Sequence, residues 1–362
     1  MDYYKYIKPL IFRFNEESSH EAAIWALKHN LLPKPDTSSS NNKKLKQRIF
    51  GLNFINPVGM AAGFDKNAEC ISGLCKQGFG FVETGTVTPI AQAGNPKPRI
   101  FRLEQDKAII NKMGFNNKGS IKYTERLQQW SENSNKDKII VGANIGKNKN
   151  TEDANSDYIK MIDAVYGLSD YITINISSPN TPNLRKLQKK EELDALLKDI
   201  SEKRTELIKT TNKNIPLLLK IAPDIDDSDK ENIAEIVSEY KIDGLIISNT
   251  TIKRDFTLEE QELAKKEGGL SGKPLFEDST SVLKDMYNIT EGKIPLIGVG
   301  GIFSGDDAYV KIKAGASLIQ IYTSVIYEGF ELVNRINKRL LELLEKDGFK
   351  NISDAIGVDA KK

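Results

Sequence analysis

Hydroxyls, amides, glycines and lysines recur in this sequence directly after short runs of apolar residues. Residues 175–180 (NISSPN) follow one such run, residues 248–250 (SNT) follow another, and Lys66 and Lys220 stand close to two more. Carboxylates are rare at these places, which disfavours hydrolysis by paired carboxylates and sites for divalent cations. Neutral hydrogen-bonding groups beside lysines suit a planar, anionic, amide-containing substrate whose difficult step is carried out by an organic cofactor.

The positions of histidine and cysteine exclude further chemistry. Both histidines, His20 and His29, fall within the first thirty residues, so the rest of the chain supplies no histidine base and no histidine-ligated metal. Cys70 and Cys75 lack the spacing of a CxxC redox or zinc pair. We therefore expect no metal site, and chemistry that depends on Lys, Ser, Thr, Asn, carboxylates or a cofactor.

Glycines and hydroxyls follow the last two apolar runs. Residues 298–301 (GVGG) and 322–324 (YTS) match the phosphate cradle that is common in α/β barrels, although the glycines alone also fit an ordinary tight turn. Lys220 ends an apolar stretch (LLLKIA), and a buried lysine is costly unless it is paired. We expect Lys220 to face a negative group, either a ligand or the partner of a structural ion pair.

The composition limits the class of protein. The chain has 362 residues, 39% of them hydrophobic, which is enough for a large core and excludes general disorder. A formal net charge of +2 disfavours a nucleic-acid binder, and two cysteines disfavour a disulfide scaffold and indicate a reducing compartment. The longest apolar runs hold about ten residues, half the length of a membrane-spanning helix, and residues 1–10 lack the apolar segment of a signal peptide.

The apolar runs also predict the fold that positions these groups. They alternate with helix-length segments, which favours an α/β fold, a (β/α)₈ TIM barrel whose strand ends meet at one mouth. The interval between Thr86 and Lys138 exceeds one helix and predicts an excursion over that mouth. The eight runs are 55–62, 79–86, 138–145, 171–177, 215–221, 243–248, 294–299 and 318–325.

A small helical extension precedes the predicted barrel. Residues 1–33 read as two short helices, the second starting at a capping box of Ser18 and Glu21, and residues 36–46 read as a flexible linker. We therefore divide the chain into residues 1–44, the helical segment with its linker, and residues 45–362, the barrel. Each helix carries an apolar stripe, which predicts either attachment to a membrane surface or a lid packed on the barrel. The stripes are Tyr3, Tyr6, Ile7, Leu10 and Phe14, then Ile24, Leu27 and Leu31.

Five strings in this order resemble the dihydroorotate dehydrogenase family: AAGFDK (61–66), NKMGFNN (111–117), NISSPNTP (175–182), SNTT (248–251) and GGLSGKPL (268–275). The resemblance extends over essentially the whole chain. The N-terminal extension and Ser178 resemble the quinone-dependent, membrane-associated class, because the soluble class has a cysteine at that position and no extension. Asn183 departs from the family, which usually has glycine before Leu-Arg, and this puts the conformation of the loop in question.

The resemblance implies oxidation of (S)-dihydroorotate to orotate in pyrimidine biosynthesis, with one FMN per chain as hydride acceptor and a membrane quinone as final electron acceptor. Lys220 corresponds to the lysine near the flavin N1–C2=O edge, where a cation stabilises the developing anion. The residues that match FMN contacts are Ala62, Gly63, Phe64, Asp65, Lys66, Thr86, Asn144, Asn175, Lys220, Ser248, Gly272, Gly301, Tyr322 and Thr323.

The resemblance also implies a substrate site. Ser178 is the expected base for the C5 proton, and because a hydroxyl is a poor base it needs help, for which a water held by Thr181 is one hypothesis. Lys66 suits the substrate carboxylate, and the asparagines can each donate to and accept from the ring amides. The residues that match substrate contacts are Lys66, Asn111, Lys112, Met113, Gly114, Phe115, Asn175, Asn180, Asn249 and Thr250.

For the whole protein we expect a monomer attached peripherally to the cytoplasmic side of the cell membrane through its N-terminal helices, with no nucleic-acid partner. Three other functions stay open at this point. They are another FMN barrel such as a tRNA dihydrouridine synthase, a non-redox phosphate-binding lyase or isomerase, and a membrane-associated binding protein without catalysis. The first of these needs a basic surface and a cysteine acid, which the sequence disfavours.

Overall fold

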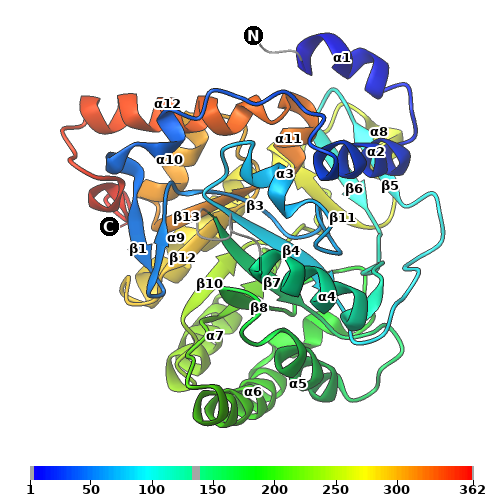
Figure 1. The fold of residues 1–362 in the computed structure, drawn as a ribbon, viewed down its shortest axis with the longest axis vertical. Helices are drawn as coiled ribbons and strands as arrows, with labels where there is room; N and C mark the ends of the chain where they lie inside the picture. Colours follow the sequence, from blue (N-terminus) through cyan, green and yellow to red (C-terminus); the bar gives the residue numbers. More distant parts are fainter. Residues whose placement is uncertain (1–3, 133–138, 361–362) are drawn as a thin grey trace.

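Eight parallel strands close into a barrel in the computed structural model, which describes residues 4–132 and 139–360 (Figure 1). The predicted (β/α)₈ barrel and its eight strands are therefore confirmed. Around the barrel the strands are β3 (Val58–Met60), β4 (Phe81–Val87), β7 (Ile140–Ile145), β8 (Tyr171–Asn175), β9 (Leu217–Ile221), β10 (Gly244–Ile247), β12 (Leu296–Val299) and β13 (Ala316–Ile321).

One apolar run combines two elements. The predicted strand 318–325 covers the end of β13 and the first half of a helix, α11 (Thr323–Glu328), so its predicted boundary is wrong. Ile319 and Ile321 of the strand and Val325 of the helix are all buried in the same core. A continuous apolar run does not distinguish a buried strand from a buried helix, because neither shows a polar face.

Helices surround the barrel between successive strands. Short 3₁₀ turns accompany them: η4 (Leu184–Gln188), η5 (Lys273–Leu275) and, after the last helix, η6 (Ile352–Ala355). The helices of this layer are α3 (Ile71–Cys75), α4 (Gly119–Ser131), α5 (Ala154–Val165), α6 (Lys190–Thr211), α7 (Asp227–Glu239), α9 (Phe276–Ile289), α10 (Gly305–Lys313), α11 and α12 (Glu331–Lys346).

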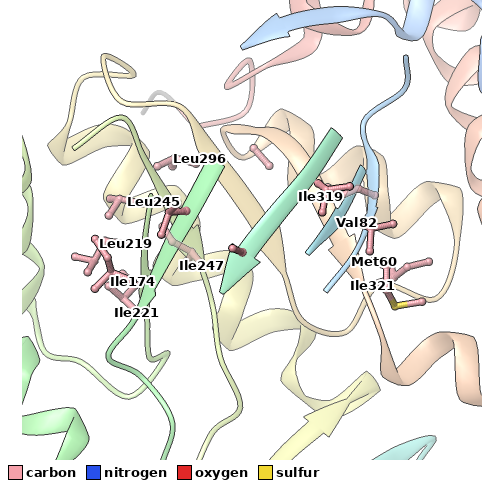
Figure 2. Close-up of a cluster of buried hydrophobic side chains, with 14 of the residues drawn as sticks. Met60, Val82, Ile174, Leu219, Ile221, Leu245, Ile247, Leu296, Ile319 and Ile321 are labelled. Carbon is pink, nitrogen blue, oxygen red and sulfur yellow. The ribbon is translucent and has the colours of Figure 1, made fainter. Parts of the chain in front are cut away.

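Alternation along the strands divides the core into two parts. Val82, Leu219 and Ile319 belong to the large cluster between the strands and the helices, and Figure 2 shows these side chains with others of the same cluster. The residues next to them point into the barrel, because successive side chains of a strand face opposite sides. The inward-pointing set at the base is apolar: Phe81, Tyr171, Leu218, Ile246, Ile297 and Leu318.

Two residues further along the same strands, the barrel interior becomes polar. Glu83, Lys220 and Gln320 point into the barrel at this level, and all three are almost completely buried. The base is covered by a hairpin of β1 (Gln47–Ile49) and β2 (Leu52–Phe54), whose Phe54 packs edge-to-face on Phe81. The strands therefore present their polar residues toward the C-terminal mouth.

The predicted excursion over the mouth is confirmed and contains strands. β5 (Ile100–Leu103) and β6 (Ala108–Asn111) pair with each other, and β11 (Gly269–Gly272) pairs with β6. β11 comes from the long connection between β10 and β12, which also carries the short helix α8 (Gln261–Ala264). This small antiparallel sheet brings Asn111 and Gly272 to the mouth.

The two predicted N-terminal helices are present as α1 (Tyr4–Ile11) and α2 (Glu16–Lys28). The predicted start of the second is wrong, because Asn15 caps α2 by accepting from the backbone N–H groups of Glu17 and Ser18. Leu27 is also not part of an outer stripe, since it is 1% exposed and faces α3. Figure 1 shows both helices at one end of the molecule, where α1 contacts α11 and α2 contacts α3 and β5.

The polar stretch 36–46 is packed rather than a flexible linker. It forms two 3₁₀ turns, η1 (Ser39–Asn41) and η2 (Lys43–Leu45), in which Ser40 and Leu45 are buried. Asn337 of α12 donates to Ser40 Oγ at 3.0 Å, and Asn56 donates to the Ser40 carbonyl at 3.1 Å. Among residues 4–132 and 139–360, we find no helix long and apolar enough to cross a membrane.

Candidate active site

A cavity of about 620 Å³ lies at the C-terminal mouth of the barrel, between the strand ends, the small sheet and the N-terminal helices. Nearly all residues that the sequence predicts for substrate or cofactor reach its wall. These are Ala62, Gly63, Phe64, Lys66, Thr86, Asn111, Met113, Gly114, Phe115, Asn175, Ser178, Asn180, Lys220, Ser248, Asn249, Thr250, Gly272, Gly301, Tyr322 and Thr323.

Three predicted contacts do not line the cavity. Asp65 is buried and accepts from the backbone N–H groups of Glu69 and Cys70, both at 2.8 Å, so its carboxylate holds the turn before α3. Asn144 lies beneath the wall, bonded to other side chains of the barrel interior. The Lys112 backbone N–H donates to the Arg99 carbonyl, which joins two segments of the loop region over the mouth. Their assignment as contacts of the cofactor or substrate stays a prediction.

Ser178 lies on the loop after β8 and is 6% exposed. Its Oγ accepts from the Asn180 backbone N–H at 3.2 Å, and the Asn180 side chain donates to the Asn111 carbonyl at 3.0 Å. Asn183, where the family usually has glycine, has φ +59°. Asparagine is one of the few other residues that adopt this left-handed conformation readily, so the substitution preserves the turn.

The asparagines at the strand ends form one hydrogen-bonded group. Asn175 Nδ2 donates to Thr86 Oγ1 at 2.9 Å, and Asn175 Oδ1 accepts from Ser177 Oγ at 2.8 Å. Asn249 Nδ2 donates to Ser177 Oγ at 2.9 Å. Ser177 is a residue that the sequence prediction missed, and it orders two amides that come from different strands.

Lys66 is enclosed at the cavity wall. Burial lowers its pKa to about 8, while the Glu17 carboxylate raises it and Arg99 lowers it. His20, which enters from α2, also lines the cavity, with its ring edge-to-face on Phe64 at 5.2 Å. Burial, assisted by the charge of Lys66, lowers the pKa of His20 to about 3, so this imidazole is neutral. His20 therefore reaches the barrel site from the N-terminal segment, although the rest of the chain has no histidine.

Lys220 has the negative neighbour that the sequence predicts. Burial lowers its pKa, and the Glu83 carboxylate in the same polar layer opposes that shift. Glu83 accepts from Asn144 Nδ2 at 2.7 Å and from Gln320 Nε2 at 2.9 Å. Tyr171 and Thr173 hydroxyls donate to it as well, at 3.0 and 3.1 Å. A fully hydrogen-bonded carboxylate and a lysine thus share one buried polar layer, in which Lys220 reaches the cavity wall.

The lining fits a phosphate-bearing planar cofactor. Gly301 has φ +73°, and a Cβ there would come within 2.5 Å of the Phe276 Cα, so only glycine leaves this backbone open. Gly272 has φ +104°, and a Cβ would come within 2.3 Å of the Lys107 carbonyl. Elsewhere in the cavity wall, Gln320 Oε1 and Thr250 Oγ1 are buried and unpartnered. Such groups indicate a bound ligand that would satisfy them.

Comparison with known proteins decides the family. A family model described as dihydroorotate dehydrogenase matches residues 44–344. The chain belongs to the dihydroorotate dehydrogenase family. It is 45% identical to dihydroorotate dehydrogenase (quinone) of Azorhizobium caulinodans over the whole of both chains. It is 46% identical to the mitochondrial enzyme of the same name from Mus musculus, over 99% of this chain and 91% of that one.

Solved structures of the dihydroorotate dehydrogenase family share the fold. The structure of DHODH from Eimeria tenella in complex with ferulenol has a TM-score of 0.92 and 40% identity, covering 98% of this chain and 99% of that one. The ligand-free form from the same organism has a TM-score of 0.89 and 42% identity, covering 95% and 99%. The resemblance drawn from the five sequence strings is therefore confirmed.

Several residues of this dihydroorotate dehydrogenase site escaped sequence reasoning. Glu83 and Gln320 are polar residues of buried strands, and the two-residue period would have assigned them to the barrel interior with Lys220. Ser177 lies inside the most specific string. His20 carries no signal, because only the docking of α2 brings it to the cavity.

Proposed function

We propose that this chain holds FMN across the mouth of the barrel and uses it to pass electrons from dihydroorotate to a quinone. Its family membership gives the reaction, the oxidation of dihydroorotate to orotate in pyrimidine biosynthesis. The observation that carries the proposal is a single cavity whose wall combines Ser178, four asparagines and two glycines of a phosphate cradle. The other barrel functions considered above need no such combination.

The cofactor side of the cavity would hold FMN. Gly272, Gly301 and Thr323 are proposed for its phosphate, and Lys220 for the ring edge, where a cation stabilises negative charge. FMN, when bound, supplies the hydride acceptor and the route of the electrons to quinone. The further proposed contacts are Ala62, Gly63, Phe64, Lys66, Thr86, Asn175, Ser248 and Tyr322.

The substrate side would hold dihydroorotate by its charge and its amides. Lys66 is the cation proposed for the carboxylate, because it lies at the cavity wall and burial makes its charge costly without an anionic partner. Asn111, Asn175, Asn180 and Asn249 are proposed for the ring amides. The Asn175 side chain already donates to Thr86 and Asn144 and accepts from Ser177, so it would exchange one of these bonds for a bond to the substrate. Met113, Gly114, Phe115 and Thr250 complete the wall.

Ser178 is proposed as the base that removes the C5 proton of the substrate. Its Oγ accepts one hydrogen bond, from the Asn180 N–H, so its second lone pair is available to accept the substrate proton. The hydroxyl proton of Ser178 would then pass to a neighbouring acceptor. A hydroxyl needs such a neighbour to act as a base. Thr181 Oγ1 is buried and unpartnered close by in the chain, which supports the hypothesis that it holds a water for this purpose.

The N-terminal segment 1–44 is proposed to admit the quinone. α1 and α2 contribute apolar residues such as Ile7, Ile11 and Ala23 to the cavity wall. Tyr6, Leu10 and Phe14 are exposed by 75%, 58% and 61%, and Lys8 lies on the same helix, as in helices that rest in a membrane interface. We propose a monomer attached in this way to the cytoplasmic side of the cell membrane.

Anaerobic mixing of the purified yellow protein with dihydroorotate tests the central proposal, since the flavin absorbance should bleach. Ser178→Ala should retain FMN and bind orotate but reduce the flavin about 10²–10⁴-fold more slowly, the usual contribution of a general base. A flavin-free protein that cannot be reconstituted would refute the FMN assignment. A Ser178→Ala protein that bleaches at the wild-type rate would refute the role of Ser178 alone.

A further inference from the structure

Arg185 joins three loops at the mouth of the barrel without lining the cavity itself. It lies in η4, directly after the string that contains Ser178. Its Nε donates to the Ser177 carbonyl at 2.9 Å, and its Nη2 donates to the Thr250 carbonyl at 2.7 Å. Its Nη1 pairs with Asp224 Oδ2 at 2.6 Å. The three partners belong to the loops that follow β8, β10 and β9.

Asp224 ties the arginine more firmly to the loop after β10. Its Oδ1 accepts from Thr251 Oγ1, and its Oδ2 also accepts from the backbone N–H of Ile252 at 3.1 Å. The ion pair is largely enclosed, with the side chains of Arg185 and Asp224 exposed by 20% and 12%. Both ends of this loop segment, the Thr250 carbonyl and the Ile252 N–H, are therefore fixed by the same pair.

The two carbonyls that Arg185 holds belong to residues of the reaction site. The Ser177 carbonyl is part of the peptide bond that leads into Ser178, and the Thr250 carbonyl follows Asn249, whose amide is proposed to meet the substrate. A guanidinium is a rigid plane that presents several N–H groups at fixed angles, and an ammonium cannot reproduce three such bonds. The separation of the two loops is thereby set by one rigid group.

We infer that Arg185, held by Asp224, is a positioning residue that fixes Ser178 against the Asn249–Thr250 segment for proton removal. The inference rests on the proposed role of Ser178 as the base. Proton transfer depends steeply on alignment, and a displacement of about 1 Å costs roughly a hundredfold in rate. Arg185→Lys keeps the charge and loses the fork, so it should lower the limiting rate of flavin reduction by dihydroorotate about 10- to 100-fold.

Arg204 offers a matched control at the opposite end of the barrel. It lies on α6, and it donates to the Lys241 carbonyl at 3.1 Å and to Asn214 Oδ1 at 2.9 Å, and pairs with Asp243 at 2.7 Å. Arg204 thus joins the segments that precede β9 and β10 by hydrogen bonds, in the same way that Arg185 joins the loops that follow β8 and β10. Arg204→Lys should leave flavin reduction within about twofold of the wild type, which separates positioning from general loss of stability.

The experiment measures anaerobic flavin reduction in four proteins: wild type, Arg185→Lys, Ser178→Ala and the double variant, with FMN content and orotate affinity as separate readouts. If Arg185 acts through Ser178, Arg185→Lys should slow the wild type 10- to 100-fold but slow Ser178→Ala less than about threefold, because the two groups act as a unit. FMN content should be unchanged. Orotate affinity should fall less than the reduction rate.

Two results would overturn the inference: wild-type reduction rates in Arg185→Lys, or an equal slowing in the presence and absence of Ser178. If Ser178→Ala itself were fast, the base assignment and this role of Arg185 would fail together, whereas a slow Ser178→Ala with a fast Arg185→Lys removes Arg185 alone. Should Arg185→Lys not fold, Asp224→Asn is used in its place. That variant removes the charge and keeps only one of the two oxygens that accept from Arg185, Thr251 and Ile252, and it should show the same dependence on Ser178.

Discussion

The pKa of Lys66 makes the affinity for orotate depend on pH in a direction that can be worked out in advance. Burial lowers this pKa to about 8 in the free protein. Only the protonated amine attracts a carboxylate, so the affinity is nearly complete at pH 7 and is lost as the pH rises through 8. Binding of the carboxylate in turn raises the pKa of Lys66, so at pH 9 the Lys66 amine should take up a proton from solution when orotate binds.

The size of the effect follows from the fraction of charged Lys66. With a pKa of about 8, this fraction falls from about nine tenths at pH 7 to about one tenth at pH 9, which raises the dissociation constant of orotate roughly tenfold. Lys66→Met removes the charged hydrogen bond at every pH, a loss of about 1.5–3 kcal/mol, or about 10- to 100-fold at pH 7. The affinity of Lys66→Met should be low and independent of pH.

Titration of the oxidised flavin absorbance with orotate between pH 6 and 9.5 measures these constants directly. Lys66→Arg is the matched control, because an arginine stays charged throughout and any pH dependence that it keeps must come from the ligand or another group. A wild-type affinity that is flat over this range, or a Lys66→Arg affinity that falls as steeply as that of the wild type, would refute the reasoning.

Three further predictions concern the cofactor and the quinone. Lys220→Met should lower FMN content or slow flavin reduction more than about tenfold, with orotate affinity of the loaded protein unchanged; a selective loss of orotate would contradict its assignment. Gly301→Ala should lose FMN, because its Cβ would meet the α9 backbone at 2.5 Å, whereas Gly51→Ala, at φ +77° in open space, should lose only about 1 kcal/mol of stability and keep FMN. Deletion of residues 1–33 retains the buried Ser40 and should leave a yellow protein that dihydroorotate reduces. This protein should still use a small soluble acceptor, but its turnover with long-chain quinone should fall sharply. Unchanged long-chain turnover would exclude quinone entry through α1 and α2.

The barrel could be predicted because its signal is local. Each strand is a short apolar run, and Lys220 stands out because it interrupts one of them. The hairpin of β1 and β2 and the strand β11 were not predicted, since each has only three or four residues and β11 pairs with a strand more than 150 positions away. Nothing within a window of ten residues marks such a pairing, which depends on loops that the barrel first brings together.

The N-terminal segment was predicted less well because its side chains have two environments. The apolar spacing identifies both helices, yet Leu27 faces α3 while Trp25 of the same helix is 58% exposed. An apolar residue contributes equally to a predicted stripe whether a membrane or a neighbouring helix covers it. The starting point of α2 shows a second difficulty, since Asn15 and Ser18 are both good caps and only the structure distinguishes them.

The contact that joins α2 to the barrel connects the two halves of the cavity. Arg99 binds Glu17 of α2 through two N–H groups, at 2.6 and 3.2 Å, and both side chains are nearly buried. The same guanidinium donates to the carbonyl of Asn95 at 2.8 Å. Asn95 Nδ2 in turn donates to the Lys112 carbonyl at 3.0 Å and to the Asn180 carbonyl at 3.3 Å.

This chain of bonds crosses from the apolar helices, where quinone is proposed to enter, to the loops where the substrate amides are proposed to bind. Glu17 and Arg99 are 82 positions apart, and their spacing carries no sequence pattern. Glutamate and arginine are common residues on protein surfaces, so only the burial of this pair marks it as important. A buried ion pair is costly to break because the remaining charge loses its partner. Arg99 therefore contacts both α2, through Glu17, and the substrate loops, through Asn95, and local sequence cannot reveal this connection.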